Sequence, residues 1–279
     1  MDLIDTHQHL IYQNEATYGW TKDIPALQSD FTVEDYHDLI KEYNIMGTLF
    51  MECAVDGPDY KKESNFINSI MQKSESGIKG LILSIRPEDD SEFDKWLEES
   101  KSLGVVGYRR VLHTEPDELS QQSNFRENIN KIGKTGKPFD LCFREDQLKI
   151  AVELSKYCDE MDLILNHCGV PAIASGKMDE WKKDITALSE LKHVTCKLSG
   201  IMAYCAPGTS SYETIRPYVD HVLDCFGPDR MVWGSDWPVL NMVDTYGNWF
   251  ELSMKFCNGF SKDEKKDIFC NTARAFYRI

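Results

Sequence analysis

Residues 78–110 read IKGLILSIRPEDDSEFDKWLEESKSLGVVGYRR and contain one complete strand–helix–strand unit. The unit begins with the apolar run 78–84 and ends with the run 105–110, and both runs are typical of buried parallel strands. Between them, Ser91-x-x-Asp94 precedes an apolar Trp-Leu pair and predicts a helix start of the capping-box type. The unit therefore favours a parallel sheet with crossover helices.

The same alternation continues in both directions along the chain. Two more predicted helix starts stand at Thr32-x-x-Asp35 and Ser261-x-x-Glu264. Six further strand-like runs occupy residues 3–7, 47–52, 139–143, 163–167, 194–198 and 231–236. Eight strands without a glycine-rich turn favour an α/β protein of the (β/α)₈ TIM-barrel type over a doubly wound open sheet. We expect one domain over residues 1–279, with long loops at residues 10–31 and 201–212.

Composition and charge exclude several classes of protein. The 42% of hydrophobic and 28% of charged residues are typical of a globular chain. The 31 basic and 46 acidic residues give a net charge of −15, which makes nucleic acids and anionic membranes poor partners. An acidic N-terminus without a signal-like basic segment, and nine cysteines without a CxxC pair, predict a cytoplasmic protein with reduced thiols. A small-molecule substrate is expected, and a homo-oligomer is compatible with these features.

Histidine and aspartate stand where predicted strands end, which is where a barrel carries its reacting groups. His7 and His9 close the first strand two residues apart, so both imidazoles face one side. His167 closes the sixth strand and Asp236 the eighth. These four residues are therefore candidate catalytic residues. Two structural alternatives stay open: His167 as a buried core histidine, and Asp236 as the N-cap of a following helix.

Four strand ends carry recognisable motifs, which are His7-Gln8-His9, Asn166-His167-Cys168-Gly169-Val170-Pro171, Cys196-Lys197-Leu198-Ser199-Gly200 and Gly234-Ser235-Asp236-Trp237-Pro238. Together these motifs resemble the amidohydrolase superfamily, and within it the sugar-acid lactonases typified by L-fuconolactonase and L-rhamnono-lactonase. The resemblance runs nearly end to end and implies a hydrolase that opens a sugar-acid (aldono) lactone by attack of water. Asp236 would be the general base, with His7, His9 and His167 around it.

The sequence departs from the superfamily at the ligands of a second metal ion. Many superfamily members use a carboxylated lysine or glutamate on strand four and a histidine on strand five. Here the fourth strand ends in Arg109-Arg110 and the fifth in Phe143-Arg144. The resemblance thus implies at most one divalent ion, Zn²⁺ or Mn²⁺. Metal-free catalysis by the same side chains also stays open. The candidate ligands are His7, His9, His167 and Asp236.

Cationic, aromatic and acidic residues near the strand ends are candidate substrate contacts. Arginine and lysine would hold hydroxyls or a carboxylate, tryptophan would stack on a sugar ring, and the glutamate would bind a hydroxyl or a metal. Ordinary ion pairing and packing are the alternatives. Of the adjacent arginines, strand alternation lets only one face the lumen, and we choose Arg109. The candidates are Arg109, Arg144, Lys197, Trp20, Trp237 and Glu52.

Two other functions are compatible with the same motifs. The first is a metal-dependent decarboxylase or another amide or ester hydrolase of the same superfamily. The second is a non-catalytic barrel that only binds a ligand. Release of acid from a lactone would separate the lactonase from both, and release of CO₂ would identify the decarboxylase.

Overall fold

The computed structural model describes all 279 residues. Its strands form one eight-stranded sheet in chain order, and each strand pairs in parallel with the next. All eight predicted runs form strands, so the TIM-barrel prediction is confirmed. The strands are β1 (Leu3–Gln8), β2 (Ile45–Met51), β3 (Ile78–Ser84), β4 (Val105–Val111), β5 (Phe139–Cys142), β6 (Leu163–Leu165), β7 (Val194–Leu198) and β8 (Met231–Trp233).

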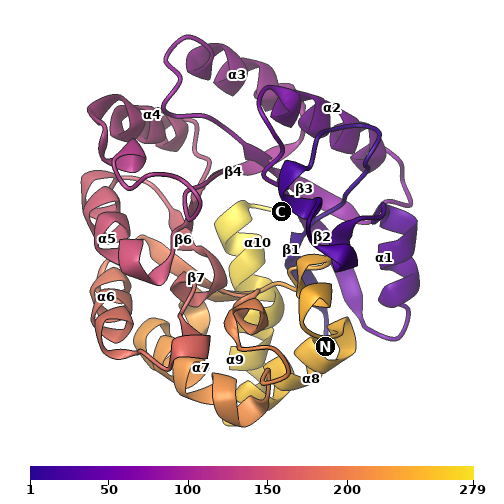
Figure 1. Ribbon diagram of the computed structural model, residues 1–279, viewed down its shortest axis with the longest axis vertical. Helices are drawn as coiled ribbons and strands as arrows, with labels where there is room; N and C mark the ends of the chain where they lie inside the picture. The colour runs from indigo at the N-terminus through magenta and orange to yellow at the C-terminus, as the bar shows by residue number, and fades with distance from the viewer.

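Helices surround the barrel as a ring, which Figure 1 shows in a view down the molecule. A last helix, α10, lies near the centre of that view. No helix is both long and apolar enough to cross a lipid bilayer. The helices are α1 (Val33–Leu39), α2 (Asp59–Met71), α3 (Phe93–Glu99), α4 (Ser123–Lys134), α5 (Leu148–Tyr157), α6 (Asp179–Glu190), α7 (Tyr212–Phe226), α8 (Tyr246–Phe256), α9 (Lys262–Lys266) and α10 (Thr272–Tyr277).

Two of the three predicted capping boxes are present. Thr32 caps α1 and Ser261 caps α9, each with the reciprocal bond from the acid three residues on. The prediction at Ser91 is wrong, because α3 begins at Phe93. The backbone N–H and the hydroxyl of Ser91 both donate to Asp89 Oδ1, at 3.1 and 2.6 Å. This local turn satisfies the serine before the helix begins.

Strand alternation creates two apolar cores. The larger core lies between the sheet and the surrounding helices and includes Leu3 and Phe50. The smaller core fills the barrel interior and contains Ile4 and Leu49 together with Tyr277 of α10. The C-terminal helix therefore closes one end of the barrel interior.

The barrel closes where β1 meets the residues that follow β8. The N–H of Asp236 donates to the carbonyl of His7 at 2.8 Å, and the N–H of His9 donates to the carbonyl of Trp237 at 2.8 Å. The Ser235 N–H also donates to the buried carboxylate of Asp5 at 2.8 Å. Closure of the barrel thus places the residues that follow β8 beside β1.

The sixth and eighth strands are shorter than predicted. They end at Leu165 and Trp233, before His167 and Asp236. Both of these residues have a positive φ, +53° for His167 and +62° for Asp236. Non-glycine residues adopt this conformation rarely and often at functional sites. The two turns direct the side chains toward the barrel mouth.

Candidate active site

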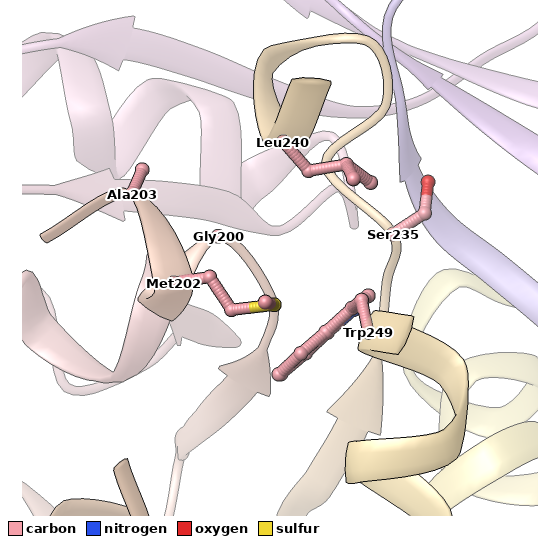
Figure 2. Close-up of a pocket in the computed structure, with 6 residues that line it drawn as sticks. All are labelled: Gly200, Met202, Ala203, Ser235, Leu240 and Trp249. Atoms are coloured by element: carbon pink, nitrogen blue, oxygen red, sulfur yellow. The ribbon is translucent and has the colours of Figure 1, made fainter. Parts of the chain in front are cut away.

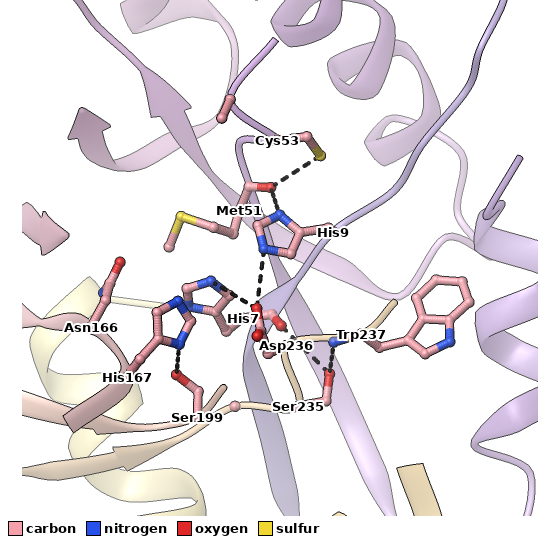
Figure 3. A network of polar contacts seen from close by, with 12 residues as sticks. His7, His9, Met51, Cys53, Asn166, His167, Ser199, Ser235, Asp236 and Trp237 are labelled. Atoms are coloured by element: carbon pink, nitrogen blue, oxygen red, sulfur yellow. Dashed lines mark hydrogen bonds and ion pairs between the residues drawn. The ribbon is translucent and has the colours of Figure 1, made fainter. Parts of the chain in front are cut away.

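Three of the four predicted catalytic residues meet at the barrel mouth (Figure 3). Asp236 Oδ1 lies 3.3 Å from His9 Nε2 and 3.5 Å from His7 Nε2, and all three residues are buried. Their candidate ligand atoms lie within 4.8 Å of one another. The spacing of His7 and His9 on one strand face, together with closure of the barrel onto Asp236, produces this cluster.

The hydrogen bonds around this cluster determine which ring nitrogens are acceptors. The carbonyl of Met51 accepts only, so His9 Nδ1, 2.9 Å away, donates to it and a neutral His9 turns the lone pair of Nε2 to Asp236. Arg109 Nη1 donates only, so His7 Nε2, 3.3 Å away, accepts. Three acceptors therefore converge, and such a set fits one shared proton, or one divalent cation that takes the lone pair of His7 Nε2 in place of Arg109.

Burial keeps His7 and His167 neutral, and neighbouring groups keep Asp236 charged. Burial lowers the pKa of His167 to about 4 and lowers the pKa of His7 well below its ordinary value. Burial raises the pKa of Asp236, but the adjacent rings of His167 and His9 and the charge of Arg109 outweigh this effect, so that pKa is lowered. At neutral pH the site holds an ionised carboxylate beside the neutral imidazoles of His7 and His167, which suits a general base.

His167 stands beside the three-residue cluster rather than within it. Its Nδ1 lies 3.0 Å from the hydroxyl of Ser199, and its ring lies 4.5 Å from the ring of His7, between centroids. His167 is therefore not a core histidine satisfied by a carbonyl. The alternative of Asp236 as an N-cap also fails, because no side chain caps the next short helix, Val239–Met242.

Gly200 lies against the side chains of His167 and Asp236 and leaves room for both. A Cβ on Gly200 would lie 2.2 Å from His167 Nδ1 and 2.7 Å from Asp236 Oδ2, and its φ is +58°. Only glycine meets both the conformation and the close approach. Gly200 ends one of the motifs that resemble the superfamily, but its contact with both side chains was not predicted, because this contact depends on three separate strand ends.

Replacement of Gly200 by alanine is expected to lower kcat/KM by at least about tenfold, because displacing either side chain spoils the reacting geometry. Gly208→Ala is the matched control, since Gly208 has a φ of +72° but no atom within 4 Å of the added Cβ. Both variants carry similar backbone strain. The comparison of kcat/KM in the two variants isolates the contact with His167 and Asp236, and equal activities would contradict this role.

Arg109, rather than Arg110, points toward the histidines. Its Nε lies 2.6 Å from Glu52 Oε1, and both side chains are buried. Arg110 instead pairs with Glu88 at 2.9 Å and Glu115 at 3.0 Å. Glu52 also accepts from the N–H of Ala54 at 2.8 Å. Arg109 and Glu52 thus form a fixed ion pair beside His7.

A cavity of about 700 Å³ opens above these residues, a size typical of small-molecule sites. The first loop contributes Trp20, whose indole N–H donates to the carbonyl of Cys53 at 2.8 Å. The residues lining the cavity are His9, Trp20, Ile24, Glu52, Cys53, Ala54, Val55, Asp56, Gly57, Arg86, Arg109, Arg110, Val111, His113, Thr114, Glu115, His167, Ala203, Tyr204, Asp236, Val239 and Met242.

Three predicted substrate contacts do not line this cavity. Lys197 is fully buried beneath it and pairs with Asp140 at 2.7 Å. Arg144 points to Asp146, 2.7 Å away, and its Nη1 donates to the carbonyl of His113 at 2.6 Å. The ring of Trp237 is buried against aromatic neighbours and points away from the histidines (Figure 3). A position at a strand end does not by itself distinguish a residue that lines the cavity from one that pairs with a neighbouring acid.

Sequence reasoning missed Arg86, His113 and Tyr204, which all line the cavity. Arg86 follows Ser84 at the end of β3 by two residues, so the alternation used for His7 and His9 could have found it. His113 and Tyr204 lie in loops after β4 and β7, where no periodic pattern applies. Tyr204 belongs to the short helix Ile201–Tyr204, and its ring lies 6.4 Å from that of His167, between centroids.

A second, smaller gap lies behind the loop that carries Asp236 (Figure 2). It is lined by Gly200, Met202, Ala203, Ser235, Leu240 and Trp249, and it has no room for a water molecule. Trp249 fills this region, and its indole N–H donates to the carbonyl of Gly234 at 2.9 Å. This packing supports the Asp236 loop from behind and offers no binding site.

A family model described as amidohydrolase matches residues 4–279. The chain belongs to the amidohydrolase family. This protein is therefore a hydrolase, and the non-catalytic alternative is set aside. The predicted resemblance to the superfamily is confirmed.

Three relatives of this amidohydrolase show the range of the family. L-fucono-1,5-lactonase of Burkholderia ambifaria is 23% identical over 99% of this chain and 95% of its own length. 4-sulfomuconolactone hydrolase of Rhizobium radiobacter is 26% identical over 84% of this chain and 75% of its own. A crystal structure of a zinc-bound amidohydrolase from Burkholderia multivorans superposes over 100% of both chains with a TM-score of 0.88 at 23% identity. This last likeness shows that the fold is shared.

Proposed function

We propose that this amidohydrolase opens a sugar-acid (aldono) lactone by attack of water, with Asp236 as the general base. The observation that carries the proposal is the ionised carboxylate of Asp236, held among three imidazoles at a cavity of small-molecule size. The L-fucono-1,5-lactonase and 4-sulfomuconolactone hydrolase relatives support lactone hydrolysis as the reaction class.

The side chains divide the work of hydrolysis among them. Asp236 accepts a proton from water while the oxygen of that water attacks the carbonyl carbon of the lactone. Donors and positive charge near the carbonyl oxygen stabilise the negative charge that forms there, and His167 and the buried Arg109 are placed for this role. Collapse of the tetrahedral intermediate breaks the ring C–O bond, and the proton on Asp236 passes to the departing ring oxygen. The product is an open-chain hydroxy acid.

A single divalent ion fits the acceptors of His7, His9 and Asp236, which would hold it. Such an ion would polarise the carbonyl and lower the pKa of water. The second ion of binuclear relatives lacks its ligands, because the guanidinium of Arg109 lies beside His7 and engages Glu52, the other acid at hand. We propose Zn²⁺ or Mn²⁺ as the ion. Without an ion, the same side chains still supply a general base and hydrogen-bond donors.

A screen of aldonolactones in weakly buffered pH indicator tests the proposed reaction, because each ring opening releases a proton. Acid release that depends on both lactone and protein is expected. If the whole panel gives none while a substituted benzoate yields CO₂, the decarboxylase alternative replaces the lactonase. Acid release from simple esters or amides alone would identify the other hydrolase alternative.

Metal analysis is expected to find at most one divalent ion per chain after loading with Zn²⁺ or Mn²⁺ and dialysis. His9→Gln removes one acceptor of the set and should lower the bound fraction at least about tenfold in a titration, since a ligand is lost. His193→Gln is the control, because His193 lies outside the cavity and donates to the carbonyl of Ser155 at 2.9 Å. Two ions per chain would contradict the prediction.

A further inference from the structure

The cavity contains one guanidinium group without a carboxylate partner. Arg86, just after β3, lines the cavity, and no carboxylate oxygen lies within 4.0 Å of it. The other two arginines of the cavity are paired, Arg109 with Glu52 and Arg110 with Glu88 and Glu115. Glu52 and Glu88, the acids whose charges act on Arg86, are thus each paired with another arginine.

The side chain of Arg86 is held in place although its charge is not paired. Its Nη1 donates to the Ser84 hydroxyl and to the Ile85 carbonyl, and its guanidinium carbon lies 4.8 Å from the centre of the Tyr60 ring. Nε and Nη2 make no hydrogen bond to the protein. A fixed guanidinium with free donors matches the geometry of a carboxylate or a similar oxyanion.

Keeping this group charged and partly buried is costly without a ligand. Burial and the nearby charge of Arg110 lower the pKa of Arg86, and the charges of Glu52 and Glu88 offset only part of this effect. A charge withdrawn from water and only partly compensated destabilises a fold, and such groups commonly mark binding sites. An anion bound at Arg86 would remove that cost.

Part of the cavity lining is apolar. The apolar lining residues are Trp20, Ile24, Val239 and Met242. The short helix Pro25–Leu27, which follows Ile24, contacts the short helix Val239–Met242. Trp20 and Met242 are among the few large apolar side chains that remain exposed. The lining of the cavity thus combines a base, imidazoles, a cation without a carboxylate partner and apolar side chains that suit a ring.

We propose that the substrate is a lactone with a second, anionic group, and that Arg86 binds this group. The inference rests on the proposed lactonase function and names its substrate class: a lactone ring with a carboxylate, or an oxyanion of the same geometry. The net charge of −15 would repel an anion at long range, so the attraction must come from a local group such as Arg86.

A matched pair of lactones tests this assignment. The neutral member is an aldonolactone, and the anionic member is the aldarolactone in which the terminal hydroxymethyl group is a carboxylate. Arg86→Gln should raise KM for the aldarolactone by at least about tenfold, the low end of a charge-assisted hydrogen bond. KM for the aldonolactone should change less than about twofold. Arg216→Gln on α7 makes the same charge change outside the cavity and should alter neither KM.

A binding measurement separates this inference from the proposed function. The ring-opened aldarate is titrated into the protein, and binding is followed by the intrinsic tryptophan fluorescence, because Trp20 lines the cavity. Its Kd should weaken at least about tenfold in Arg86→Gln and stay unchanged in Arg216→Gln. If neither lactone is hydrolysed but this difference in Kd appears, the anion site stands and the lactonase proposal fails. Equal effects of Arg86→Gln on both lactones, with an unchanged Kd for the aldarate, overturn the anion site.

Discussion

Asp236→Asn is expected to lower kcat for lactone hydrolysis by at least about a hundredfold, the low end of general-base contributions, because an amide cannot take the proton from water. The fold should stay intact. Asp236 has a φ of +62°, and asparagine tolerates that conformation as well as aspartate does. The backbone bond from residue 236 to the His7 carbonyl is also retained.

The measurement is kcat in the pH-indicator assay together with the thermal midpoint of unfolding. Asp244→Asn is the control, because Asp244 lies in the same loop region but does not line the cavity, and its Oδ2 accepts from the Ser210 hydroxyl at 3.1 Å. The control should keep its kcat. Near-normal turnover in Asp236→Asn would show that another group is the base.

Lys197→Met is expected to lower the free energy of unfolding by about 3–5 kcal/mol, the usual effect of breaking a buried ion pair. Lys197 Nζ lies 2.7 Å from Asp140 Oδ2, and both side chains are fully buried. The same carboxylate accepts from Asn166 at 2.7 Å and from the Tyr277 hydroxyl at 3.2 Å. Removing the ammonium leaves a buried charge beneath the active site.

Denaturant unfolding of native protein, Lys197→Met and Lys149→Met measures this effect. Lys149 pairs with Glu180 on the surface, so its loss should cost no more than about 1 kcal/mol. Combining Lys197→Met with Asp140→Leu should recover part of the stability, because the orphaned charge is gone. A change for Lys197→Met as small as that for Lys149→Met would contradict a structural role for the pair.

The strands could be predicted from sequence because their signal is local. A buried parallel strand is a continuous apolar run, and runs such as 78–84 and 194–198 have the same limits in the structure. The ends were less predictable where the chain turns for a reason outside the run. The positive φ of His167 and of Asp236 ends two strands early, and no local preference of histidine or aspartate required it.

The convergence of His7, His9 and Asp236 followed from sequence once a barrel was assumed. Strand alternation places the two histidines on one face, and a closed barrel brings the eighth unit to the first. Strand alternation relates residues two positions apart, and barrel closure relates the first strand to the last. Both rules can be applied once the order of the predicted strands is known.

The tertiary structure alone decided which charged side chains belong to the cavity. Arg86, Arg144 and Lys197 all stand at or just beyond strand ends, yet only Arg86 lines the cavity, because Asp146 and Asp140 hold the other two. A cation's direction depends on which acid lies nearest in space, and that acid can be 57 residues away, as between Lys197 and Asp140. Sequence therefore determined the barrel and the cluster of His7, His9 and Asp236, whereas long-range pairing determined which cations line the cavity.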